Sequence, residues 1–247
     1  MKIKVLYEDP NILAIDKPSG ILVHPSTTLR ASPDPKTIID IFRKKYPKIE
    51  IVHRLDKETS GIMLIAKNQK TYEFLKKQFM GRVVKKIYHA IVSGFVKNDH
   101  GIINKPIGRS PSDFRRHLAG RGARGELREA ITEYKVLKRL TLPLAPSLIK
   151  EGRNSSPPTK GEMPKAEGVF SYLEIKPKTG RTHQIRVHMK FLNHPVVCDS
   201  LYNPKGACPK SLNRLALHAY SIEFKDLKGA TVKVESQLPK EFEKVVK

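Results

Sequence analysis

Acidic residues, cysteine and long apolar runs are all scarce in this chain of 247 residues. It contains 24 Asp and Glu residues against 47 Lys and Arg residues, so its formal net charge is +23. The cations are spread along most of the chain rather than gathered in a tail. Because like charges on one surface repel each other, a polyanion is the partner that relieves them. The composition predicts binding to nucleic acid, and a basic enzyme with an unrelated substrate is the alternative.

The two cysteines, Cys198 and Cys208, do not belong to a Cys-x-x-Cys pair. They indicate neither a disulfide framework nor a zinc site, and they suit a reducing cytoplasm. No segment approaches the roughly 20 apolar residues of a spanning helix, and the N-terminus lacks the apolar run of a signal peptide. We therefore expect a cytoplasmic protein with no membrane partner.

Short alternating runs rich in β-branched residues recur along the chain and predict a sheet. The expected strands are residues 3–7, 12–15, 61–66, 86–95, 130–137, 169–175, 215–224 and 231–234. Helical patterns cover residues 37–45, 70–80 and 182–193, the last with Thr182 as N-cap. Many strands and few helices, without strict alternation, predict an α+β fold with a mostly antiparallel sheet. The hydrophobic content of 39% suffices for a real core.

Two segments depart from this pattern. Residues 105–128 hold seven Lys or Arg residues, two acids and four glycines, which predicts a mobile basic loop able to grip phosphates. Residues 143–165 hold five of the 18 prolines and separate two runs that can pair as a hairpin. We expect this second segment to be a disordered insertion, because lengthening a loop costs little free energy.

The stretch HRLDKETSG, residues 53–61, places Asp56 between Arg54 and Lys57 on an expected loop. Neighbouring cations favour the ionised carboxylate, which can act as a nucleophile or a base. The alternative is that Asp56 only forms an ion pair with Lys57 on the surface and has no catalytic role. A glycosidase pair of Asp56 with Glu58 is disfavoured, because this spacing does not let the two acids flank a sugar from opposite sides.

A second polar cluster, TGRTHQIRVH at residues 179–188, starts at a glycine turn and enters a helix. Backbone N–H groups and arginines near a helix N-terminus favour anions, and an arginine here can meet Asp56 across a cleft. Helix capping with an exposed basic face is the alternative. A metal site is disfavoured because His183 and His188 are five residues apart rather than four.

The third cluster is KKIYHAIVSG, residues 85–94, which alternates as a strand. Tyr88 shares its face with the small residues Ala90 and Gly94, which leave room beside its ring. An enzyme that acts on a nucleobase takes the base out of the stack and commonly holds it on an aromatic ring. Packing in the core is the commoner role of a tyrosine in a strand.

Together these segments resemble RNA pseudouridine synthases of the RluA family over nearly the whole chain. The motifs are KPSGILVHPS at 17–26, VHRLDKETSGIMLIAK at 52–67, KKIYHAIVSG at 85–94, EAITEYKVL at 129–137, KTGRTHQIRVHMKFLNHPVVCDSLY at 178–202 and RLALHA at 214–219. The resemblance implies one catalytic domain over residues 1–247, with a mixed, mostly antiparallel sheet flanked by helices and loops. It also implies isomerisation of uridine to pseudouridine in RNA, without a cofactor or a metal.

Site roles follow from the resemblance, residue by residue. Asp56 is expected to be the catalytic aspartate, Tyr88 to pack on the target base, and Arg186 to pair with Asp56. Arg54 is expected to help open the RNA and fill the space of the flipped nucleotide. Further expected residues are Ile185 and Leu217 as pocket walls and, for RNA binding, Arg115, Arg116, Arg121, Arg124 and Arg181.

Many relatives carry an N-terminal S4 RNA-binding module, but here the catalytic pattern starts within the first ten residues. We therefore expect RNA affinity to come from the domain itself, acting as a monomer on an rRNA or tRNA stem-loop. Two alternatives stay open: a non-catalytic RNA-binding or ribosome-assembly protein with the same fold, and a nucleosidase that releases free base. The motifs do not choose between attack of Asp56 on C1′ and removal of the C2′ proton.

Overall fold

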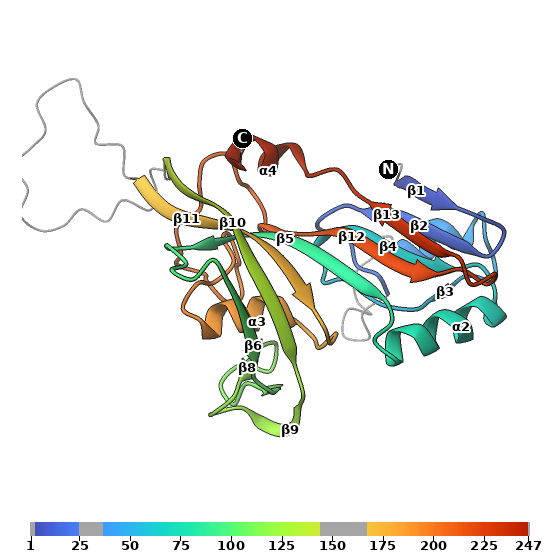
Figure 1. Cartoon of the computed structure of the whole chain (residues 1–247), viewed down its shortest axis with the longest axis horizontal. Helices are drawn as coiled ribbons and strands as arrows, with labels where there is room; N and C mark the ends of the chain where they lie inside the picture. Colours follow the sequence, from blue (N-terminus) through green and yellow to red (C-terminus); the bar gives the residue numbers. More distant parts are fainter. Residues whose placement is uncertain (1–2, 25–36, 144–166, 247) are drawn as a thin grey trace, which may run out of the picture.

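The computed structural model describes residues 3–24, 37–143 and 167–246, and one ten-stranded sheet runs through this part of the chain (Figure 1). Its main path is β1-β2-β4-β12-β5-β11-β10-β6, and the β4–β12 pair is parallel, whereas the other paired strands are antiparallel. The strands are β1 (Lys4–Glu8), β2 (Ile12–Lys17), β3 (Glu50–Ile51), β4 (Ser60–Ala66), β5 (Lys85–Ser93), β6 (His100–Asn104), β10 (Ile131–Pro143), β11 (Glu167–Pro177), β12 (Leu217–Lys225) and β13 (Thr231–Glu235). All eight expected strands and the mixed, mostly antiparallel α+β fold are confirmed.

Four helices are described, and two match their expected ranges closely. Helix α1 (Ile38–Arg43) begins with a capping box between Thr37 and Asp40, and α2 (Gln69–Met80) begins at the N-cap Asn68. The short helix α4 (Lys240–Val246) was not expected. None of the described helices has the length and apolar character that crossing a lipid bilayer requires.

Helix α3 (Gln184–Phe191) begins later than expected, and the prediction of Thr182 as its N-cap was wrong. The N-cap is His183, in the left-handed conformation with φ of 55°, and its side chain caps nothing. The side chain of Gln184 instead fixes the turn before the helix, because its Oε1 accepts the backbone N–H of Arg181 at 2.9 Å and the hydroxyl of Thr179 at 2.7 Å.

Residues 105–128 form a second, three-stranded sheet, so the prediction of a mobile loop was wrong. It is ordered β8-β7-β9 from β7 (Ile107–Arg109), β8 (His117–Ala119) and β9 (Arg124–Arg128). Ile107 is buried in a small core with Val187 and Tyr202, which fixes this sheet against α3. One buried isoleucine among many charges is a weak signal in the sequence pattern.

The expected hairpin exists, because β10 and β11 pair antiparallel from Thr132 opposite Pro177 to Pro143 opposite Glu167. The insertion predicted at residues 143–165 lies, beyond Pro143, outside the described residues.

Cys198 and Cys208 form a disulfide with their Cα atoms 5.1 Å apart. The expectation that the cysteines would not form a bridge was therefore wrong. Their separation of ten residues gave no pairing signal, but a turn folds residues 198–208 back on themselves.

A close approach between β4 and β12 brings the two halves of the sheet together. Gly61, with φ of 106°, lies so near Ala219 that an added Cβ would be 2.2 Å from the Ala219 carbonyl oxygen. Only glycine permits this approach. His218 is then in register with Ser60 on one side and His89 on the other, which aligns the starts of β4 and β12 with β5.

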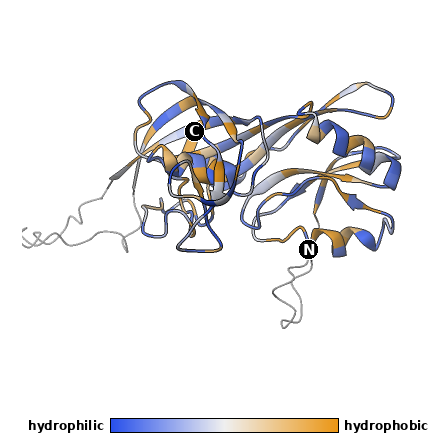
Figure 2. Ribbon diagram, turned by 90° about the horizontal axis from the view of Figure 1, so that it is seen from below, coloured by the Kyte–Doolittle hydropathy of each residue, from blue (hydrophilic) through white to orange (hydrophobic). Residues whose placement is uncertain are grey.

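Separate hydrophobic cores lie under the two halves of the sheet. One includes Leu173 and Met189, and another includes Met63 and Phe42; Tyr88 packs against both of them. Hydrophobic and hydrophilic residues are interspersed along the strands and helices, as elements with one buried face require (Figure 2). The start of β4 and the middle of β5 therefore meet where the two cores meet.

Candidate active site

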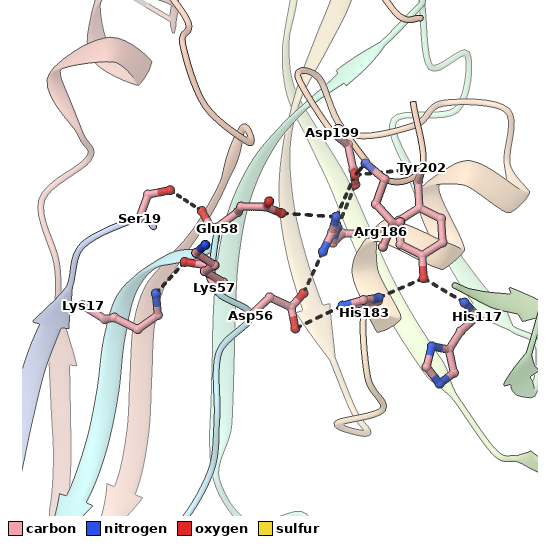
Figure 3. A network of polar contacts seen from close by, with 11 residues as sticks. Lys17, Ser19, Asp56, Lys57, Glu58, His117, His183, Arg186, Asp199 and Tyr202 are labelled. Atoms are coloured by element: carbon pink, nitrogen blue, oxygen red, sulfur yellow. Dashed lines mark hydrogen bonds and ion pairs between the residues drawn. The ribbon is translucent and has the colours of Figure 1, made fainter. Parts of the chain in front are cut away.

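The loop that carries Asp56 is held by the last residue of β2, Lys17, and by the residues that follow it. The Lys17 side chain is fully buried, and its ammonium donates to the carbonyl oxygens of Pro18 and Lys57 at 3.0 and 2.9 Å. Ser19 donates to the carbonyl of Glu58 at 2.6 Å, and the Gly20 N–H donates to that of Lys57 at 2.8 Å (Figure 3). These bonds fix the backbone at residues 57–58 and therefore fix the position of Asp56, which directly precedes them.

Burial of Lys17 lowers its pKa to about 8, although the nearby charges of Asp56 and Glu58 act in the opposite direction. Its ammonium is still mostly protonated at neutral pH. A positive charge therefore lies beneath the loop, in addition to the cations beside it in sequence.

Arg186 on α3 meets three carboxylates. Its guanidinium binds Asp199 in a bidentate manner, with both N–O distances at 2.7 Å, and lies 3.4 Å from Asp56 and 3.5 Å from Glu58 (Figure 3). Burial alone would lower the pKa of Arg186, but the hydrogen bonds and charge of Asp199, with Asp56 and Glu58, raise it. The arginine is a permanent cation, and the expected meeting of Arg186 with Asp56 is present in the structure.

Asp56 opens onto a pocket between the two cores. The expected residues Tyr88, Ile185 and Leu217 all line it, together with Lys86 and Arg54. Ile185 and Leu217 are buried, whereas Arg54 is exposed. Burial raises the pKa of Tyr88, and the charge of Asp56 raises it further, so its hydroxyl stays protonated.

Arg181 joins this pocket to two neighbouring grooves, because it lines all three. One groove runs between the Gly180 turn and the second sheet, where Arg109 and Arg128 line it. The other runs past Arg54 towards the end of α2. The exposed side chain of Arg54 and the half-buried side chain of Arg181 thus flank the mouth of the pocket.

The four arginines expected to bind RNA from residues 105–128 lie on the second sheet but outside these linings. Arg115 forms a bidentate pair with Asp113, and Arg116 lies 3.4 Å from the same carboxylate. Arg121 and Arg124 are exposed, in the β8–β9 turn and at the start of β9. The groove next to the pocket uses Arg109 and Arg128 instead, which no sequence motif singled out.

Sequence reasoning also missed the residues behind Arg186. Asp199 is the sole acid of the segment CDSLY, and nothing local marks it as the partner of an arginine 13 positions earlier. The ring of Tyr202, from the same segment, lies under Arg186, with 5.1 Å between the ring centre and the guanidinium carbon. The Tyr202 hydroxyl contacts His183. The weak signal was that CDSLY stands within the motif of residues 178–202.

The glycosidase alternative finds no support in the geometry. Asp56 and Glu58 converge on one guanidinium rather than facing each other across an open cleft. In chemical terms the site offers the Asp56 carboxylate, an aromatic wall, apolar walls and a cationic rim. That set suits a reaction at an anomeric carbon next to a planar base held out of solvent.

A profile of the family described as RNA pseudouridylate synthase matches residues 11–191 of this chain. Ribosomal large subunit pseudouridine synthase D of Borreliella burgdorferi is 34% identical over 97% of this chain and 66% of its own length. The protein of the same name from Neisseria meningitidis serogroup B is 35% identical over 97% of this chain and 59% of its own. Dual-specificity RNA pseudouridine synthase RluA of Vibrio vulnificus is 33% identical over 90% and 77%. The chain thus spans about two thirds of the length of the curated relatives it matches.

Solved structures share the fold. Human RNA pseudouridylate synthase domain containing 4 superposes with a TM-score of 0.66 at 25% identity, covering 96% of this chain and 89% of that one. Human RNA pseudouridylate synthase domain containing 1 superposes with a TM-score of 0.72 at 24% identity, covering 96% and 84%. The fold that the motifs implied is confirmed.

Proposed function

The chain belongs to the RNA pseudouridylate synthase family, and we propose that it isomerises uridine to pseudouridine within a structured RNA. The observation that carries this proposal is the single pocket that Asp56 and Tyr88 line together with the apolar residues Ile185 and Leu217. The name of the Borreliella burgdorferi relative favours rRNA as the substrate, and tRNA is the alternative that we propose. A stem-loop suits the pocket, because its unpaired bases can be splayed out at low cost.

In the proposed reaction the bond between uracil N1 and ribose C1′ breaks, the base turns in the pocket, and C5 bonds to C1′. The C5 proton leaves and N1 gains one, so the product is an isomer and nothing is consumed. Asp56 either attacks C1′ or removes the C2′ proton, and Arg186 supports either role by placing a positive charge beside the carboxylate and orienting it. Tyr88, Ile185 and Leu217 hold the detached base while it turns.

Arg54 stands exposed at the rim next to the pocket, where it can occupy the space that the flipped nucleotide leaves in the RNA. Arg181 is suited to a phosphate beside the target, because it lies at the junction of the three grooves. Its guanidinium is only partly used, since Nε donates to the Glu129 carbonyl at 2.9 Å. We propose that the second sheet extends this binding surface to more distant phosphates.

The central test uses RNA tritiated at uracil C5, from which isomerisation releases tritium to water. We expect release with the wild-type protein and none with Asp56→Asn, which keeps the shape of the side chain but not its charge. Asp226→Asn is the matched control, because Asp226 only accepts backbone N–H groups in a turn, as an asparagine also does. If every stable RNA were left unmodified by wild type, the enzymatic proposal would fail in favour of a non-catalytic RNA-binding protein. Free uracil in the chromatogram would identify a nucleosidase.

Salt dependence tests the RNA surface. Removing one arginine that binds a phosphate should reduce the slope of log affinity against log salt by about 0.7 to 0.9. Replacing Arg115, Arg116, Arg121 and Arg124 with glutamine should flatten the slope, and so should replacing Arg109 and Arg128. If the slope is unchanged in the variant of four arginines but flattened in the variant of Arg109 and Arg128, the RNA lies in the groove that Arg109 and Arg128 line and does not reach the other four.

A further inference from the structure

His183 has a costly backbone conformation that the start of α3 does not explain. Its φ of 55° lies in the left-handed region, which a residue with a Cβ adopts rarely. Its side chain makes no capping bond to the N–H groups of α3. The conformation does turn the imidazole into the pocket, where Nε2 faces Oδ1 of Asp56 at 3.9 Å (Figure 3).

The other side of the imidazole is held by Tyr202. Nδ1 of His183 lies 2.9 Å from the Tyr202 hydroxyl, which accepts the backbone N–H of His117 from β8, also at 2.9 Å. The single hydroxyl proton is then free to point at Nδ1. That arrangement makes Nδ1 the acceptor and places the imidazole proton on Nε2, the nitrogen that faces the carboxylate. The opposite tautomer would aim a lone pair at an anion.

Arg186 and His183 each lie next to a different oxygen of the Asp56 carboxylate. The guanidinium lies 3.4 Å from Oδ2, and the imidazole Nε2 lies 3.9 Å from Oδ1. The first is a long hydrogen bond, and the second exceeds hydrogen-bond length. Hydrogen bonds in a catalytic site are often long before substrate binds. Burial, with the neighbouring cation Arg186, lowers the pKa of His183, although the charge of Asp56 raises it, so the imidazole is neutral at pH 7.

We propose that His183 is a positioning residue: its Nε2–H, selected by Tyr202, fixes the orientation of the Asp56 carboxylate in the reaction proposed above. The inference rests on that proposed function. The proposal also connects the site to the second sheet, because the backbone N–H of His117 on β8 donates to the Tyr202 hydroxyl and so determines where its proton points. The carboxylate orientation thereby depends on where β8 lies.

The test measures single-turnover tritium release and RNA affinity in three single variants and in the double variant His183→Phe/Tyr202→Phe. His183→Phe keeps a ring but removes the donor, and we expect the rate to fall about 100-fold, the effect of misplacing a reacting group by about 1 Å, with an unchanged Kd for RNA. His183→Gln can present an amide N–H towards Asp56 and should recover at least tenfold of that loss. Tyr202→Phe keeps the ring under Arg186 but no longer selects the tautomer of His183 with its proton on Nε2. The rate should therefore fall when Tyr202→Phe is made in the wild-type protein, and it should fall no further when Tyr202→Phe is added to His183→Phe.

The outcomes separate this inference from the proposed function. If wild type releases tritium and His183→Phe does so within twofold, the positioning role is wrong while the isomerase proposal stands. Additive losses in the double variant would show that Tyr202 does not act through His183, which also overturns the inference. If wild type is inactive on all RNA, the proposed function itself fails. Urea midpoints within 0.5 M of wild type confirm that each variant is folded, and His183→Gln and Tyr202→Phe carry the test if His183→Phe does not fold.

Discussion

The pair of Arg186 and Asp199 provides the sharpest prediction about stability. Both side chains are almost completely buried, and two N–O contacts of 2.7 Å join them. In Asp199→Asn the retained oxygen can still accept from Arg186 Nη2 and from the backbone of Leu201 and Tyr202. The new amide group, however, replaces the oxygen that accepted from Nε, so two donors face each other.

Removing one partner of a buried ion pair costs about 3 to 5 kcal/mol. We expect about 3 kcal/mol here, at the lower end, because Asp56 and Glu58 still lie within 3.5 Å of the guanidinium. With a urea dependence of roughly 3 kcal/mol per molar, the unfolding midpoint should fall by about 1 M. The single-turnover rate should also fall, because Arg186 loses the partner that fixes it. Asp226→Asn is the control, and a midpoint for Asp199→Asn equal to that of this control would refute the reasoning.

Three further predictions concern protons and the disulfide. The half-buried His53 accepts the Leu64 N–H through Nε2, and loss of solvation lowers its pKa to about 3. Between pH 6.5 and 3 the unfolded state binds the extra proton, so the free energy of unfolding should fall by about 1.4 kcal/mol per pH unit as pH drops. Urea titrations should show a shallower fall in His53→Gln. Burial lowers the pKa of Lys86 to about 8, so RNA affinity in filter binding should weaken as pH rises from 7 to 9, with an equal decline in Lys86→Arg counting against a role for its charge. Reducing the Cys198–Cys208 disulfide, which spans ten residues, should lower the free energy of unfolding by about 3 kcal/mol, whereas the double serine variant should not respond to reductant.

The strands were predictable because each buries one face, and alternation records that burial in the sequence. β4 reads as a near-continuous apolar run because its residues are all buried, and even so its composition identified it. The pairing of β4 with β12 was not predictable, because it joins Gly61 to Ala219 across the chain and rests on the absence of a Cβ at one position. Local pattern therefore predicted the elements but not the contact that assembles the site.

The site residues divide in the same way. Asp56, Tyr88 and Arg186 lie in motifs whose resemblance to a known family named them in advance, and the structure places all three in or beside one pocket. Their supporting residues are single side chains: Lys17 at the end of β2, and Asp199 on the turn after α3. Each supports the site through a bond that the fold creates between segments distant in sequence, and no local periodicity encodes such a bond.

Arg186 is bound most tightly to Asp199 and not to the acid that we propose to be catalytic. The bidentate pair satisfies the guanidinium at 2.7 Å, whereas Asp56 is 3.4 Å away. A carboxylate locked in a short bidentate pair would have its lone pairs committed to the arginine and would be a poorer nucleophile or base. By giving the buried cation its own counter-ion, the fold keeps a fixed positive charge beside Asp56 while leaving the oxygens of Asp56 available. The loss of activity expected for Asp199→Asn follows from this division, because an unpartnered Arg186 would turn to Asp56 and hold it.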